Sequence, residues 1–158
     1  SFLALDNFDK LKEEKTRLDT VVNSTITKAR ASFSKVNLPT TYRHYVDLEI
    51  QSDFSMGYPD TIGFRAGTCT PFLFYDLDFE IQTPLRIHPY QLMDFSLLNH
   101  ASFLDKKETL IRAIKEVKNV NGTFTPIFHN YTFSTWTRWS DFKTLFNIIL
   151  DTPHDVST

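Results

Sequence analysis

The chain has 158 residues, of which 41% are apolar and 23% charged, and its 17 basic and 19 acidic residues give a formal net charge of -2. These are globular values without a break in composition, so we expect a single domain over residues 1–158. No basic stripe is present that could neutralise a phosphate backbone, which argues against nucleic acid as a partner. The single cysteine, Cys69, cannot form an internal disulfide. The sequence contains no run of about 18 apolar residues, so it predicts no membrane span.

The first third of the chain predicts a helix, a short strand and a second helix. Residues 6–22 carry apolar side chains at close to helical spacing, behind Asp6 as a candidate cap. Residues 24–33 are β-branched at their start, which favours a short strand. Residues 38–50 again have a helical pattern, with Pro39 in the first turn.

The rest of the chain predicts strands that alternate with helices. The helix over residues 105–122 is the clearest element, because Asp105 and Glu108 have the spacing of a capping box and Gly122 follows as a stop. The other expected elements are strands at 53–58, 71–77, 85–94 and 123–130 and a helix at 140–150. This alternation predicts an α/β fold with mostly parallel strands, in which functional groups follow the carboxyl ends of strands.

Two polar residues stand directly after the apolar runs of predicted strands. His129 follows the apolar run TPIF, and Asp94 follows YQLM in the same way. An imidazole beside a carboxylate is what general acid–base hydrolysis requires. The alternative interpretation of His129 is a structural histidine whose hydrogen bonds are satisfied within the fold.

The stretch GYPDTIGFRAG has three of the four glycines of the chain. Gly63 and Gly67 flank Arg65, so the backbone can turn tightly there and hold the guanidinium in a fixed place, where it could clamp a carboxylate. The alternative is a structural ion pair between Arg65 and an aspartate. The candidate partners are Asp53, Asp60, Asp76 and Asp94.

Generic enzyme motifs are absent from the sequence. It has no Gly-x-Ser-x-Gly elbow, no P-loop, no dinucleotide-binding fingerprint and no His-Glu-x-x-His pair. The enzyme classes that depend on these motifs lose support accordingly.

Three blocks of sequence point to one family. The strings DFSMGYPDTIGFRAGTCTPFLFYDL, PYQLMDFSLL and NGTFTPIFHN resemble the bacterial polysaccharide deacetylase-like proteins, the NodB-homology group of carbohydrate esterase family 4, and within it a divergent branch found in Bacteroidetes. The resemblance runs from about Leu5 to Leu150. It implies a distorted (β/α) barrel that removes N- or O-acetyl groups from sugars. It also implies a divalent metal, often zinc, bound by one Asp and two His.

The resemblance assigns roles to individual residues. His129 in PIFHN is similar to the proposed general acid, and Arg30 in ARASF to the arginine that orients the catalytic carboxylate. In the family, a further motif helps to tune the histidine to which His129 is similar. Asp60 and Arg65 are similar to the residues that replace this motif in the branch. Asp94 in QLMD matches a branch motif. The substrate-binding residues that we expect are Tyr58, Asp94 and Trp136.

The sequence departs from the family pattern in two ways. The early Asp-Asp block and the second, histidine-containing motif are absent from these residues, and the resemblance places them upstream of Ser1. We therefore expect the chain to be the carboxyl-terminal portion of the domain, truncated at its N-terminus, without the metal ligands or the catalytic base. Ser32 also stands where the family motif has Pro, or His in this branch.

Three functions are consistent with the sequence. The first is a metal-dependent polysaccharide deacetylase of the bacterial cytoplasm or cell envelope. The second is a carbohydrate-binding pseudoenzyme module, in which aromatic side chains such as Tyr58, Trp136 and Trp139 hold a sugar without hydrolysing it. The third is an interaction unit that forms a homo-oligomer through exposed strand edges.

Overall fold

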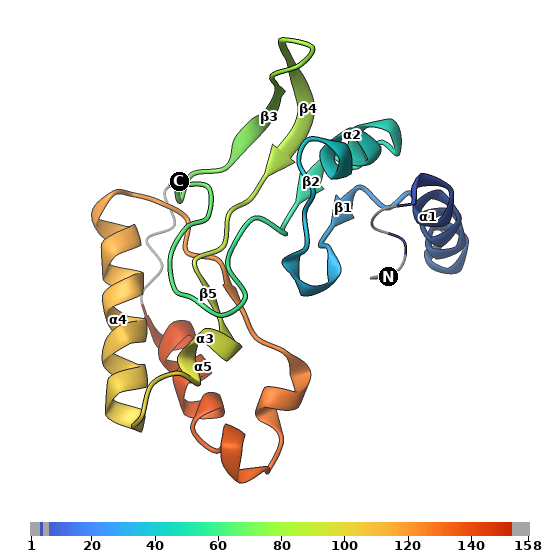
Figure 1. The fold of residues 1–158 in the computed structure, drawn as a ribbon. Helices are drawn as coiled ribbons and strands as arrows, with labels where there is room; N and C mark the ends of the chain where they lie inside the picture. The colour runs from blue at the N-terminus through green and yellow to red at the C-terminus, as the bar shows by residue number, and fades with distance from the viewer. Residues whose placement is uncertain (1–3, 5–6, 153–158) are drawn as a thin grey trace.

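The computed structural model describes residue 4 and residues 7–152, which form two small sheets with helices around them (Figure 1). The larger sheet has the order β1-β2-β4-β3 and the smaller one pairs β5 with β6. The strands are β1 (Lys28–Ala29), β2 (Ser52–Asp53), β3 (Phe72–Asp76), β4 (Ile81–Ile87), β5 (Leu92–Met93) and β6 (Pro126–Ile127). All pairs are parallel except the β3–β4 hairpin. The predicted α/β class with mostly parallel strands is confirmed, and the sheets that the described residues form are open.

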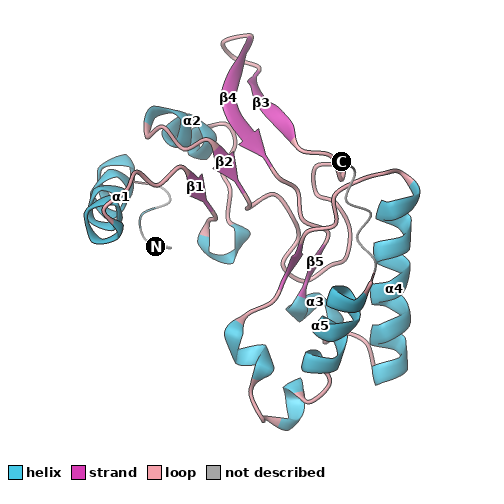
Figure 2. Cartoon of the chain, turned by 180° about the vertical axis from the view of Figure 1, so that it is seen from behind, coloured by secondary structure: helices cyan, strands magenta, loops and turns pink. Residues whose placement is uncertain are grey.

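The helices gather around the two sheets separately (Figure 2). Helices α1 (Phe8–Val22) and α2 (Thr40–Asp47) lie near β1 and β2, whereas α4 (Phe103–Asn119) and α5 (Phe142–Asp151) lie together near β5. The short elements are α3 (Asp94–Leu97) and the 3-10 helices η2 (Ser32–Ser34), η3 (Asn130–Phe133) and η4 (Thr137–Trp139). None of the helices in the described part of the chain is long and apolar enough to cross a membrane.

Each sheet has its own hydrophobic core. Tyr42, Leu85 and Ile87 are buried in the core of the larger sheet. Phe142 and Leu145 of α5 belong to the second core, beside the smaller sheet. A third, smaller cluster consists of Tyr90, Met93 and Ile127. The candidate site lies where segments that follow strands of both sheets meet.

The helix starts differ from those predicted. Asp6, the expected cap of the first helix, lies outside the described residues, and Asn7 caps α1 by accepting a 3.0 Å hydrogen bond from the Lys10 backbone N–H. The predicted capping box of the long helix is wrong. Ser102 caps α4 instead, because its Oγ accepts from the Asp105 backbone N–H at 3.1 Å and donates to the Asp105 carboxylate at 2.7 Å.

The strands are shorter than the apolar runs that predicted them. The expected strand at 53–58 ends at Asp53, because the side chain of this residue accepts from the Ser55 backbone N–H and closes a local turn. The expected strand at 85–94 is two strands, β4 and β5, and the chain between them includes Pro89, which cannot donate a ladder hydrogen bond. Apolar periodicity thus located the strands but not their ends.

The hairpin of β3 and β4 projects from the rest of the molecule (Figure 1). β3 lies at the edge of its sheet, and Tyr75, Leu77, Phe79 and Ile81 of the hairpin are exposed. Arg43 of α2 anchors the turn end of the hairpin through Asp76 and Asp78. The predicted homo-oligomer stays a prediction.

Candidate active site

Asp94 and His129 meet at the carboxyl ends of two paired strands. β5 and β6 run parallel with Met93 opposite Ile127, so the residues that follow both strands emerge at the same edge. His129 Nδ1 lies 2.9 Å and 3.0 Å from the two oxygens of the Asp94 carboxylate. The His129 backbone N–H also donates to this carboxylate, at 2.6 Å. The structure therefore brings together two residues that lie 35 positions apart in the sequence.

The Asp94 carboxylate is buried and fully occupied by donors. It is 0% exposed, and its Oδ1 also accepts from the Phe95 backbone N–H at 2.8 Å. Because an ionised carboxylate can only accept hydrogen bonds, His129 Nδ1 carries the proton in this arrangement. The other ring nitrogen, Nε2, is then the one that can accept a proton from a ligand or donate one to it.

Two aromatic rings hold the imidazole of His129. Tyr131 stacks on it with ring centroids 4.9 Å apart and an interplanar angle of 15°. Phe95 meets it edge-on, at 5.9 Å and 82°. The His129 side chain remains 29% exposed, so the ring is fixed on one side and accessible on the other.

His129 opens onto a cavity of about 620 Å³ at the boundary of the two sheets. The cavity takes its walls from four separate segments, which follow β1, β2, β5 and β6. Its lining residues are Arg30, Ala31, Ser32, Phe33, Ser34, Pro59, Asp60, Met93, Phe95, His129 and Tyr131. Of the predicted site residues, Arg30, Asp60 and His129 line this one cavity, and Asp94 lies directly behind His129.

The remaining predicted site residues lie elsewhere. Arg65, Tyr58 and Trp136 are exposed and are not among the residues that line the cavity. Trp139, named in the carbohydrate-binding alternative, is only 4% exposed and belongs to the second core. Gly63 and Gly67 both take a positive φ, which is compatible with the tight turn predicted around Arg65.

The other buried aspartates have partners of their own. Asp53 accepts hydrogen bonds from the Tyr42 hydroxyl at 2.9 Å and from Ser55, and burial raises the pKa of its carboxyl. Asp76 is held by both ends of the Arg43 guanidinium, at 2.6 Å and 2.7 Å, and these hydrogen bonds lower the pKa of its carboxyl. Neither carboxylate is therefore the partner that was considered for Arg65. Within residues 7–152, no carboxylate forms an ion pair with Arg65.

The described residues do not fit the metal that the family resemblance implies. They contain no group of three His, Cys, Asp or Glu side chains that could hold a metal ion. Asp60 and His129 are the residues of these types that line the cavity, whereas the family pattern requires one Asp and two His. We therefore derive no chemical step through a metal.

Sequence analysis missed the aromatic walls of the cavity. Phe95 and Tyr131 come one and two residues after Asp94 and His129, so their position just beyond strand ends was an available signal. Phe33 had no such signal, because its role depends on the left-handed backbone of its loop.

Comparison of the chain with protein-family models, with curated proteins and with solved structures found no match.

Proposed function

We propose that the protein hydrolyses acetyl groups on a polysaccharide, within a distorted (β/α) barrel of the NodB type, and that His129 is the proton-transferring residue. The observation that supports this function best is the buried Asp94 carboxylate bound to Nδ1 of a histidine that lines a cavity. Arg30 and Asp60, which the resemblance assigns to the same site, line the same cavity.

In this proposal Asp94 sets the direction of proton transfer. It keeps the proton of the neutral imidazole on Nδ1, so that Nε2 has a lone pair on the cavity side. His129 takes up a proton at Nε2 from the attacking water and then donates it to the sugar oxygen or nitrogen as the bond from the acetyl carbon to that atom breaks. Water supplies the oxygen of the new carbon–oxygen bond, and the products are acetate and the free sugar hydroxyl or amine.

Arg30 and Asp60 complete the polar part of the cavity. Arg30 contributes a positively charged guanidinium group to the cavity. It therefore favours a carboxylate or a developing negative oxygen in the cavity. Asp60 adds an exposed acceptor that suits sugar hydroxyls.

The test is acetate release by the full-length protein from a panel of acetylated glycans, with zinc or cobalt and with a chelator. We expect His129→Ala to lower the rate by about 100-fold or more, the usual contribution of a positioned proton donor. His100→Ala is the matched control, because His100 does not line this cavity. Release that is equal in His129→Ala and in the unchanged protein would exclude the proposed role.

A non-catalytic carbohydrate-binding module is the second candidate. The observation that favours it is the set of aromatic rings in the cavity, since Phe33, Phe95 and Tyr131 all line it. Aromatic faces can pack against the apolar face of a sugar ring. Glycan binding that survives chelation, without acetate release from any substrate, would support this function over hydrolysis.

A further inference from the structure

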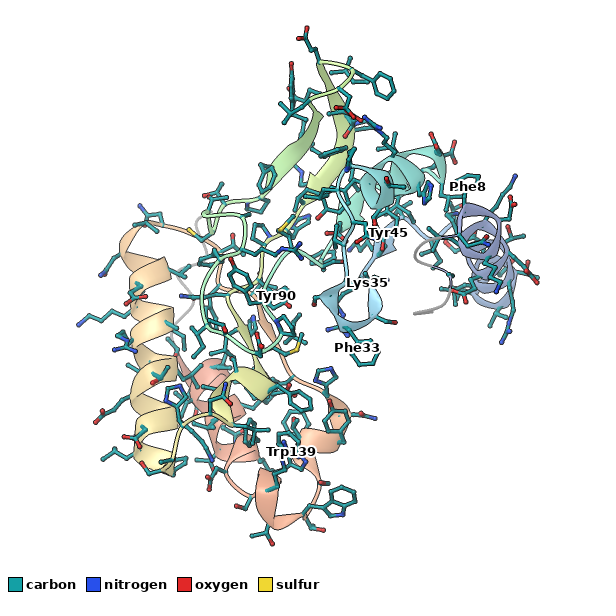
Figure 3. All side chains as sticks on the ribbon, in the orientation of Figure 1. Phe8, Phe33, Lys35, Tyr45, Tyr90 and Trp139 are labelled. Atoms are coloured by element: carbon teal, nitrogen blue, oxygen red, sulfur yellow. The ribbon has the colours of Figure 1, made fainter. Side chains whose placement is uncertain are left out.

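Phe33 combines a strained backbone with an exposed aromatic ring. It lies in η2, in the loop between β1 and α2, where its φ is 57° and its ψ 20°. Ser34, the next residue, also has a positive φ, of 53°. The Phe33 residue is 78% exposed and lines the cavity of His129. In Figure 3 its ring points from this loop away from α2.

This conformation is unfavourable for both residues. A left-handed backbone is unfavourable for each residue that has a Cβ, and it is a clear outlier for one as bulky as phenylalanine. Such strain persists only where the surrounding structure enforces it, and it gathers at functional sites. Burial of the ring does not account for the strain, because Phe33 is exposed.

Hydrogen bonds to the core fix the loop on both sides of Phe33. Before it, the Ala31 backbone N–H donates to the buried Ser55 hydroxyl at 2.7 Å. After it, the Ser34 hydroxyl accepts from the Tyr90 hydroxyl, also at 2.7 Å, and both residues are buried.

Tyr90 is itself held closely by its surroundings. A Cβ placed on Gly57 would lie 2.5 Å from the Tyr90 ring, so the absence of a side chain at Gly57 makes room for that ring. The loop around Phe33 is thus built on buried contacts.

The cavity beside Phe33 has the mixed character of a sugar site. Phe33 comes from the segment after β1, whereas Phe95 and Tyr131 come from the segments after β5 and β6. Arg30 and Asp60 provide a donor group and an acceptor group among these rings. A volume of about 620 Å³ lies within the usual range for small-molecule sites.

We propose that Phe33 is a stacking platform for a pyranose ring, and that the strained loop holds the platform in place beside His129. A pyranose ring has an apolar face that matches the phenyl ring and hydroxyl groups that match Arg30 and Asp60. The proposal rests on the proposed function in one respect, the choice of an acetylated sugar as ligand. Phe33 is a binding residue here and takes no part in proton transfer.

The variant Phe33→Gly tests this proposal without disturbing the loop. Glycine adopts a positive φ without the Cβ penalty, so the variant removes the ring and relieves the strain. We expect its melting temperature to equal or exceed that of the parent. We also expect a loss of sugar affinity of about tenfold, within the range that aromatic packing contributes. Phe33→Trp, which restores an aromatic face, should bind within about threefold of the parent.

Affinity is measured by calorimetry on the full-length protein in a His129→Ala background, so that turnover does not interfere. The probes are a β-1,4-linked N-acetylglucosamine tetramer and an acetylated xylan oligosaccharide. The matched control is Tyr75→Ala, an exposed aromatic residue of β3 that does not line the cavity. Its affinity should equal that of the parent.

The outcomes separate this proposal from the proposed function. If Phe33→Gly binds the probes as tightly as the parent, or if the parent binds neither probe, the platform is refuted whatever the acetate assay gives. If the glycine variant loses binding while His129→Ala leaves acetate release unchanged, the platform stands and the proposed catalytic role falls.

Discussion

Replacement of Asp94 by asparagine tests the central contact of the candidate site. The carboxylate accepts from three N–H groups, which are the backbone N–H groups of Phe95 and His129 and the imidazole Nδ1–H. An amide of the same shape has a single acceptor oxygen. Whichever way the amide is oriented, its NH2 group then faces a backbone N–H, either that of Phe95 or that of His129.

The expected magnitude follows from this count. One buried N–H without an acceptor costs about 1–3 kcal/mol, and hydrogen bonds to the charged carboxylate become weaker neutral ones. We therefore expect Asp94→Asn to lower the free energy of unfolding by about 2–4 kcal/mol. The NH2 group also donates to Nδ1 in one orientation, which moves the imidazole proton to Nε2 and removes the acceptor that faces the cavity.

Two measurements check this expectation. Urea unfolding followed by circular dichroism gives the loss of stability as a shift in the midpoint with an unchanged slope. Nitrogen NMR of the His129 ring reports which nitrogen carries the proton. Asp47→Asn is the matched control, since Asp47 is exposed and its substitution should cost within about 0.5 kcal/mol. An Asp94→Asn variant that is as stable as the parent, with the proton still on Nδ1, would refute the reasoning.

Two further predictions concern pH. Burial raises the pKa of Asp53 above its ordinary value of about 3.9. Between the unfolded and the folded pKa, the folded state therefore binds a proton that the unfolded chain has lost, and the stability that this proton contributes falls as pH rises through the folded pKa. Asp53→Asn should remove this dependence in unfolding curves measured from about pH 4 to pH 8, and parallel curves for variant and parent would contradict it. The pKa of Asp76 is lowered by Arg43, so its contribution is complete above about pH 3.9 and is lost as pH falls through the folded pKa. Arg43→Gln should therefore destabilise the protein near neutral pH and progressively less in acid, and a pH-independent difference would count against the ion pair.

Local sequence patterns determined the fold class and much of the helix content. The helical spacing of apolar residues in 6–22, 105–122 and 140–150 depends on the chain itself, and helices occur in all three places. The sequence also indicated that Asp94 and His129 each follow an apolar run, because the change from apolar to polar residues is a local pattern. The tight turn expected around Arg65 was also readable, and Gly63 and Gly67 have the positive φ that suits such a turn.

Tertiary structure decided which of these residues meet. The sequence has four aspartates that could pair with Arg65. In the structure, three of them have other partners, since Asp53 is bound by Tyr42, Asp76 by Arg43 and Asp94 by His129. A hydrogen bond between residues 35 positions apart depends on the pairing of β5 with β6, which no local pattern encodes. The ends of the short strands were unreadable for the same reason, since strand length is set by the partner strand.

The most consequential feature to come from tertiary structure alone is the loop of Phe33. Phenylalanine favours strands and buried positions, so its sequence context predicted an ordinary strand residue at 24–33. The structure instead holds it exposed in a left-handed conformation, because hydrogen bonds with Ser55 and Tyr90, far along the chain, fix the loop on both sides. Local preference gave the class of fold and the positions of Asp94 and His129 after apolar runs. Contacts between distant residues decided which side chains line the cavity.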